Sequence, residues 1–161
     1  MVSVRSILFV CIGNSCRSQM AEGFARAYGA DVLRPASAGI SPASTISPLT
    51  RQVMLEKNIP LDAHFPKGLE LFGGQRFDIL VNLSGTRLPK ELEAGEVLQW
   101  LAPDPIGGPE GFFRQVRDQI ETLVMQLILR LRNLPPGNPQ PGGEQPQMRV
   151  RFRGMAPVRK N

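Results

Sequence analysis

The chain has 161 residues, of which 42% are hydrophobic and 20% are charged. This length and composition are those of one globular domain and exclude a wholly disordered or collagen-like chain. No apolar run approaches the roughly 18 residues that cross a bilayer, and the first ten residues lack the pattern of a secretory signal. Two cysteines, Cys11 and Cys16, cannot make the disulfide framework of a small secreted domain. The sequence therefore predicts a cytoplasmic protein without a membrane span.

The net charge of +5 is concentrated near the C-terminus. Residues 134–161 carry five basic side chains against one acidic side chain, whereas residues 1–133 carry 14 basic and 13 acidic ones. Six prolines and four glycines also fall within these last 28 residues. Such a segment buries too little apolar surface to offset the entropy of ordering. The sequence predicts a catalytic domain over residues 1–133 and a flexible, basic, Pro/Gly-rich tail over residues 134–161.

Apolar runs typical of strands alternate with amphipathic segments along the first 133 residues. The expected elements are, in chain order, a strand over 4–10, a helix over 18–28, a strand over 32–38, a helix over 48–57, strands over 77–83 and 97–101, and a long helix over 110–132. This alternation predicts an α/β fold with a parallel sheet covered on both faces. Ligands of such sheets bind beyond the carboxyl ends of the strands.

The segment VCIGNSCRS, from Val10 to Ser18, connects the first expected strand to the first expected helix. A helix N-terminus presents unpaired amides and a partial positive charge, which suit a tetrahedral oxyanion. Gly13 and Asn14 tolerate positive φ, so the loop can curl and point successive amides inward. Cys11 would lie at the base of this cradle, where the same amides favour the thiolate and make the sulfur a nucleophile.

Two more side chains of this loop suit the same chemistry. The planar guanidinium of Arg17 can bind two oxygens of a phosphate or arsenate at once, and Ser18 can donate a hydrogen bond to the sulfur. A lone cysteine at the end of a strand is more often a structural residue, but the whole pattern favours a nucleophile. The segment lacks the Gly-Lys-Ser/Thr of a nucleotide-binding loop. Two cysteines and one distant histidine do not suit zinc, so neither a metal nor a cofactor is predicted.

The segment from Val10 to Glu22 resembles the low-molecular-weight protein tyrosine phosphatases and their relatives, the thioredoxin-type arsenate reductases. The resemblance covers about residues 4–132. It includes the motifs Ser37-Ala-Gly39, Leu61-Asp-Ala-His64, Phe77-Asp78 and Asp104-Pro105. It implies the family fold, an α/β fold with a four-stranded parallel sheet flanked by helices on both faces and the phosphatase loop between the first strand and the first helix.

The phosphatase branch of this resemblance implies hydrolysis of a phosphate monoester, on a phosphorylated protein such as one carrying phosphotyrosine or on a small phosphoester. Cys11 would attack phosphorus and form a cysteinyl-phosphate, which Arg17 and the loop amides stabilise. Asp104 would protonate the leaving oxygen and then activate water, although Asp-Pro is also common in turns. The residues implied to bind substrate are Ile12, Gly13, Asn14, Ser15, Cys16, Arg17 and Ser18, with Asn14 fixing the loop and Ser18 stabilising the sulfur.

Several residues look more like the arsenate reductase branch than like the tyrosine phosphatases. In the phosphatases an aromatic residue follows the Asp-Pro pair, whereas Ile106-Gly-Gly108 follows it here. Ser15, Gln19, Gly23 and Trp100 match the arsenate reductases better. The main prediction is nevertheless a cysteine-dependent phosphatase, and an arsenate reductase is the alternative.

This chain lacks two cysteines that the arsenate reductase branch carries. Its members carry two relay cysteines after the third strand, but Ser84 stands near the first of these positions and no cysteine follows it here. Arsenate reduction would therefore need an external thiol as reductant, or Cys16 as resolving thiol. Cys16 lies five residues from Cys11 in one curled loop, within reach of a disulfide that would protect an oxidised Cys11. The simpler alternative is that Cys16 is a small buried hydrophobe.

Three remaining features are expected to have simpler roles. His64 is expected to pack or to form a hydrogen bond rather than to catalyse, and Trp100 is expected to lie in the core. The tail residues Arg149, Arg151, Arg153, Arg159 and Lys160 could bind an acidic protein, a nucleic acid or an anionic membrane surface. A solvated tail is the simpler interpretation of this charge.

Overall fold

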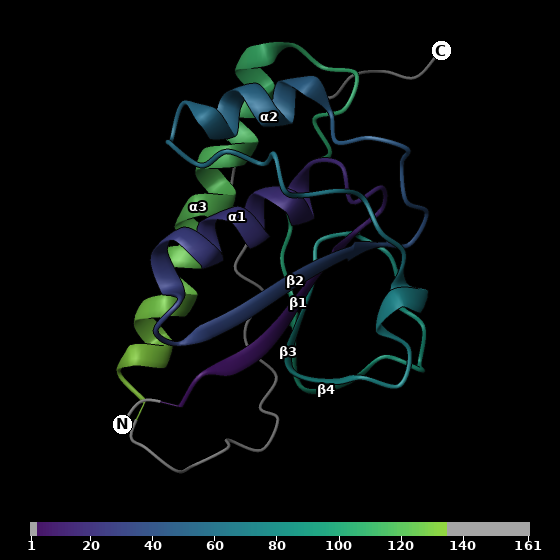
Figure 1. Ribbon diagram of the computed structural model, residues 1–161, viewed down its shortest axis with the longest axis vertical. Coiled ribbons are helices and arrows are strands. Elements are labelled where there is room, and N and C mark those ends of the chain that lie inside the picture. Colours follow the sequence, from purple (N-terminus) through teal and green to yellow (C-terminus); the bar gives the residue numbers. More distant parts are fainter. Residues whose placement is uncertain (1–2, 135–161) are drawn as a thin grey trace.

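The computed structural model describes residues 3–134 (Figure 1). Its elements are, in chain order, β1 (Arg5–Cys11), α1 (Arg17–Gly29), β2 (Leu33–Gly39), α2 (Pro48–Leu55), the 3-10 helix η1 (Leu69–Phe72), β3 (Arg76–Asn82), β4 (Glu93–Gln99) and α3 (Glu110–Arg132). Apart from Leu134, the predicted tail lies outside the described residues. No helix in residues 3–134 combines the length and the apolar character needed to cross a membrane.

The four strands form one parallel sheet in the order β2-β1-β3-β4, which confirms the predicted sheet. β1 lies at the centre, so that Phe9 pairs with Ser37 of β2 on one side and with Val81 of β3 on the other. From Ser6 to Cys11 every residue of β1 is buried. A strand that is covered on both faces reads as a continuous apolar run, which is why the sequence identified this strand well.

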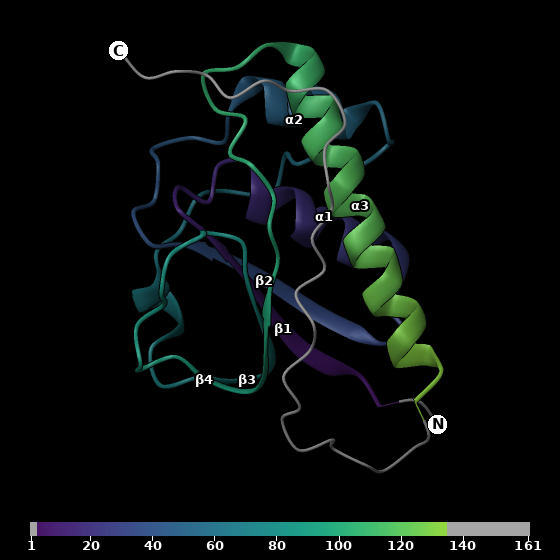
Figure 2. The ribbon, with the colours of Figure 1, turned by 180° about the vertical axis from the view of Figure 1, so that it is seen from behind.

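The two faces of the sheet are covered differently (Figures 1 and 2). α1 and α3 pack side by side on one face, with α2 against α3, over a large apolar core. The other face carries η1 and extended segments around a smaller core of Leu8, Val10, Ala38, Phe77 and Leu80. Helices therefore lie on both faces as predicted, although the four-residue η1 is the helix of the second face.

α3 confirms the prediction for residues 110–132 at both ends. Its buried side chains recur at intervals of three or four residues, as an amphipathic helix requires. They include Phe113, Val116, Ile120, Leu123, Leu127 and Leu131. This stripe packs against α1 and the sheet and closes the large core.

The fourth strand is present as predicted, but its predicted bounds of 97–101 were wrong, because β4 spans Glu93–Gln99. β4 is an edge strand, and Glu93 and Val97 are exposed. The first residues of β4 are therefore a strand because they pair with β3, and not because they follow an apolar pattern. Trp100 lies just past the strand, where its ring packs against Phe9 at 5.8 Å between ring centroids, in line with the expected core role.

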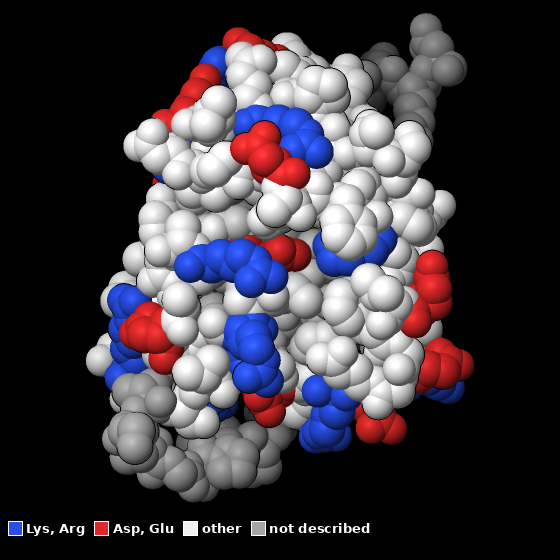
Figure 3. Space-filling model, viewed as in Figure 1, with Lys and Arg blue, Asp and Glu red and all other residues white. Residues whose placement is uncertain are grey.

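The other element boundaries differ from the predictions by one or two residues. α2 ends at Leu55 instead of residue 57, and Asn58 then adopts a positive φ of 58° that stops the helix. The surface on the side of α1, α2 and β2 mixes the two signs of charge (Figure 3). Such mixing agrees with the near balance of charge over residues 1–133.

Candidate active site

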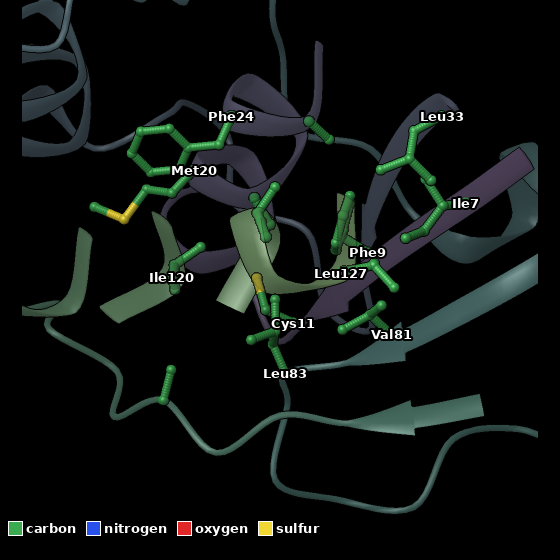
Figure 4. Close-up of a cluster of buried hydrophobic side chains, with 14 of the residues drawn as sticks. Ile7, Phe9, Cys11, Met20, Phe24, Leu33, Val81, Leu83, Ile120 and Leu127 are labelled. Carbon is green, nitrogen blue, oxygen red and sulfur yellow. The ribbon is translucent and has the colours of Figure 1, made fainter. Parts of the chain in front are cut away.

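Cys11 is the last residue of β1, and α1 begins at Arg17, so the loop from Ile12 to Cys16 lies at the carboxyl edge of the sheet. Cys11 pairs with Gly39 at the end of β2 and is only 2% exposed. Figure 4 shows it among the buried side chains that surround the end of the central strand. The site is thus at the edge where ligands of parallel sheets bind.

The backbone carbonyls of the loop are held from outside by the segment 40–47. Amides of that segment donate to four of them: Ile40 to Cys11 (3.1 Å), Ser41 to Ile12 (2.8 Å), Ala43 to Gly13 (2.9 Å) and Ser47 to Ser15 (3.2 Å). Within residues 3–134, none of the amides from Ile12 to Cys16 donates to a protein acceptor. With its carbonyls engaged outside, the loop has its amide donors available for an oxyanion.

Asn14 and Ser18 form a directed chain of hydrogen bonds to the Cys11 sulfur. Asn14 Nδ2 donates to Ser18 Oγ at 2.8 Å, and Ser18 Oγ lies 2.9 Å from Cys11 Sγ. Because Ser18 accepts from Asn14, its own hydroxyl proton is free to point at the sulfur. The predicted donation from Ser18 is therefore supported by geometry, and it stabilises a thiolate more than a thiol.

The curled shape of the loop depends on Asn14 and Gly39. Asn14 has a φ of 48°, whereas Gly13 does not adopt the positive φ that glycine tolerates. A Cβ on Gly39 would lie 2.7 Å from Ile12 O and 2.8 Å from Asn14 N. Both contacts are to backbone, so the close approach of β2 to the loop requires glycine here.

Arg17 is 5% exposed and is held by the loops that follow β3 and β4. Its Nη1 donates to Leu83 O at 2.7 Å and to Ala102 O at 3.1 Å. Its Nη2 lies 3.5 Å from Asp104 Oδ2, and the Asp104 side chain is 46% exposed. Asp104 also accepts a hydrogen bond from the amide of Ile106 at 3.2 Å, so it both shapes its turn and reaches the site.

Cys16 is 3% exposed and belongs to the large apolar core. Burial raises the pKa of its thiol from the usual 9.0 to about 12. Both cysteines are free thiols. At neutral pH Cys16 is therefore protonated and a poor nucleophile.

Sequence reasoning missed a polar network behind the loop that centres on Glu22, which is 4% exposed. Ser37 Oγ accepts from Asn14 Nδ2 at 2.9 Å and donates to Glu22 Oε1 at 2.7 Å. His64 Nδ1 lies 3.5 Å and Lys67 Nζ 3.8 Å from the same carboxylate. Burial lowers the pKa of both His64 and Lys67. The motifs that contain Ser37 and His64 were noted in the sequence, but nothing local connects them with Glu22, and only the fold brings the three together.

Ser84, near the position of the first relay cysteine, lies in a tight turn after β3. Its hydroxyl donates to Asn82 Oδ1 at 2.6 Å, and Asn82 Nδ2 donates to Thr86 O at 2.7 Å.

Residues 3–134 contain no group of three or more His, Cys, Asp or Glu side chains that could hold a metal ion.

The family model of the low molecular weight phosphotyrosine protein phosphatases matches residues 6–134 of this chain. A glutaredoxin arsenate reductase of Synechocystis sp. is 34% identical over 131 residues, which cover 80% of this chain and 99% of that protein. Arsenate reductase 2 of Staphylococcus haemolyticus is 32% identical over 126 residues, covering 74% of this chain and 93% of that protein.

Solved structures agree with these sequence relatives. An arsenate reductase in the phosphate binding state superposes with a TM-score of 0.74 at 33% identity, covering 80% of this chain and 99% of that one. The YwlE arginine phosphatase of Geobacillus stearothermophilus superposes with a TM-score of 0.65 at 28% identity, covering 80% and 93% respectively. This chain belongs to the low molecular weight phosphotyrosine protein phosphatase family, whose fold it shares with arsenate reductases and phosphatases.

Proposed function

We propose that this protein reduces arsenate to arsenite, with Cys11 as the nucleophile and an external thiol as the reductant. The observation that carries this choice is the similarity to proteins named arsenate reductases, which covers 93–99% of their length and 74–80% of this chain. The loop geometry supports the chemistry, because an amide-lined cradle and Arg17 suit any tetrahedral oxyanion. Arsenate reduction is therefore favoured over the phosphate monoester hydrolysis that was the main prediction from the sequence.

In the first step the Cys11 thiolate attacks arsenic, an S–As bond forms, and an As–O bond breaks. Asp104, whose Oδ2 lies 3.5 Å from Arg17 Nη2, would protonate the departing oxygen, which leaves as water. In the second step a thiol RSH, as its thiolate, attacks the Cys11 sulfur. The S–As electron pair passes to arsenic, which leaves as arsenite, and a Cys11–S–S–R disulfide remains. A second RSH then restores Cys11 and releases RSSR.

The external thiol is favoured over Cys16 by the burial of the Cys16 side chain. A thiol with a pKa of about 12 is almost wholly protonated at pH 7 and attacks slowly. A relay through the region after β3 is not available either, because Ser84 and its neighbours carry no thiol. We therefore assign Cys16 to packing during turnover and keep a protective disulfide with Cys11 as its proposed role under oxidation.

Arsenite formation with glutathione, with and without glutaredoxin, tests the proposal. The expected result is thiol-dependent arsenite formation that is lost in Cys11→Ser. Protein quenched during turnover should carry a glutathione mixed disulfide on Cys11, in the wild type and in Cys16→Ser alike. Absence of arsenite together with steady hydrolysis of para-nitrophenyl phosphate would reject the proposal.

A phosphatase is the second candidate, and the exposed Asp104 favours it. A general acid that serves an organic leaving group must be accessible, and the Asp104 side chain is 46% exposed beside Arg17. The same loop would then form a cysteinyl-phosphate that water hydrolyses. Ester hydrolysis that is lost in Cys11→Ser and slowed in Asp104→Asn would establish this second activity.

A further inference from the structure

Gln19 is a fully buried polar side chain in the first turn of α1, one residue after Ser18. Its Nε2 lies 3.2 Å from Asn14 O, 3.1 Å from Asn14 Oδ1 and 3.1 Å from Phe65 O. Its Oε1 lies 2.9 Å from His64 Nδ1. The carboxamide thus connects the loop of Cys11 with the segment around His64.

Three oxygens fix which way the Gln19 amide points, because Asn14 O, Asn14 Oδ1 and Phe65 O can only accept and therefore face Nε2. Oε1 then faces His64 and can only accept, so His64 Nδ1–H is the donor of this hydrogen bond. Both Nε2 protons then face Asn14 and the carbonyl of Phe65. A flipped amide would place Oε1 against the oxygens of Asn14 and Phe65 and leave the His64 donor facing an amino group. His64 therefore acts on the loop through Gln19.

Gln19 also holds the one loop carbonyl from Cys11 to Ser15 that the segment 40–47 does not hold. The carbonyls of Cys11, Ile12, Gly13 and Ser15 are held by the segment 40–47. The carbonyl of Asn14 is the one in this run that a side chain holds, and that side chain is Gln19. Asn14 also has the positive φ of 48°. The hydrogen bond from Gln19 to the Asn14 carbonyl therefore stabilises the strained turn of the loop.

We propose that Gln19 is a positioning residue that keeps the peptide between Asn14 and Ser15 in its anion-binding orientation. Without the Gln19 donor, the buried Asn14 carbonyl loses its partner, which favours rotation of this peptide. Rotation would turn the Ser15 amide out of the cradle and point a carbonyl dipole into it. An oxyanion would then lose one donor and face a repulsive acceptor. This inference rests on the proposed oxyanion chemistry at Cys11 but holds for either reaction.

Calorimetric titration with inorganic phosphate tests the proposal on the full chain, without turnover. Gln19→Met keeps the length of the side chain and removes its hydrogen bonds. We expect the Kd for phosphate to rise about tenfold, the effect of losing a charge-assisted hydrogen bond. Val53→Ala is the control for a general loss of stability, because Val53 is fully buried in the large apolar core and contributes no side-chain hydrogen bond. It should lower the thermal stability and leave the Kd unchanged.

A second pair of variants tests the same contact from the other side. His64→Leu removes the donor to Gln19 Oε1 and should weaken phosphate binding, whereas His64→Gln supplies an amide donor and should restore it. Phosphate binding that is equal in wild type, Gln19→Met and His64→Leu would overturn the inference, as would a weakening shared by Val53→Ala. If the wild type does not bind phosphate, the proposed function and this inference fall together.

Discussion

The Ser18 hydroxyl is the hydrogen-bond partner of the Cys11 sulfur. The Asn14 amide donates to Ser18 Oγ, which leaves the Ser18 hydroxyl proton free to point at Cys11 Sγ, 2.9 Å away. Asn14 is in turn oriented by Lys67, whose backbone N–H donates to Asn14 Oδ1 at 3.0 Å. A hydrogen bond that favours the thiolate helps both when Cys11 attacks and when it leaves.

Ser18→Ala should lower kcat/KM with either substrate by about 10- to 100-fold, the range for losing a hydrogen bond to a charged group. The same variant should slow the alkylation of Cys11 by iodoacetate at pH 6. Steady-state kinetics and alkylation rates check this, with the exposed Ser44→Ala as control. Unchanged rates in Ser18→Ala would show that the hydroxyl does not stabilise the sulfur.

The stability of the fold should depend on His64 in mild acid. Burial lowers the pKa of His64 below its usual 6.5, although Glu22 opposes this and Arg26, Lys67 and Arg51 reinforce it. The unfolded chain therefore binds a proton before the folded chain does, and stability falls as the pH drops below 6.5. The urea midpoint should decrease from pH 7.5 to pH 5.5, and His64→Gln should flatten this decrease. A slope that is equal in both proteins would contradict the assignment.

The residues of the site were predictable where they are neighbours in the sequence. Cys11, Asn14, Arg17 and Ser18 fall within eight positions between a strand and a helix, and the chemistry of each suits that location. The partners Ser37 and His64 come from distant segments, and only the folded chain shows what they contact.

At the scale of elements, the close contact between the end of β2 and the loop orients the loop amides. The carbonyl of Ile12 and the amide of Asn14 would both lie within 3 Å of a Cβ on Gly39. Neither backbone atom can shift unless the whole loop moves. The end of β2 therefore fixes the position of the loop.

Gly39→Ala should therefore displace the loop and lower kcat/KM by about 100-fold, as misplaced catalytic groups do. Kinetics and thermal melting check this. Gly111→Ala is the matched control, because Gly111 lies in α3 with no neighbour within 4 Å of an added Cβ, and alanine should slightly stabilise the helix. Full activity in Gly39→Ala would show that the loop tolerates a shift.

Elements with strong patterns were predictable, and those defined by pairing were not. The apolar stripe of α3 repeats every three or four residues, because one face of the helix is buried along its whole length. The extent of this repeat in the sequence predicts where the helix begins and ends. β4 begins at Glu93 and includes Gly95, which are poor strand formers. The backbone of β3 beside it makes this segment a strand, and that pairing leaves no local sequence signal.

At the scale of the whole molecule, the parallel sheet brings four connections to one edge. The loop after β1 supplies Cys11, the segment after β2 holds its carbonyls, and the loops after β3 and β4 supply Leu83 O and Ala102 O to Arg17. Each connection begins at the carboxyl end of a strand, so the fold itself brings the parts of the site together.

A chain that ends after Leu134 should keep the activity and thermal stability of the full protein. The buried apolar residues of the described chain extend from Ile7 to Leu131, and the family match ends at residue 134. Melting curves and kinetics on both chains check this expectation. Loss of activity on truncation would assign a catalytic or binding role to residues 135–161.

The proposed reaction requires Cys11, and not Cys16, to be a reactive thiolate at the base of an oxyanion site. Alkylation with iodoacetate at pH 6, mapped by mass spectrometry, measures this directly. We predict rapid modification of Cys11, little modification of Cys16, and slowing of the Cys11 reaction by phosphate or arsenate. Slow modification of Cys11 until alkaline pH, or a rate that neither anion changes, would contradict the account.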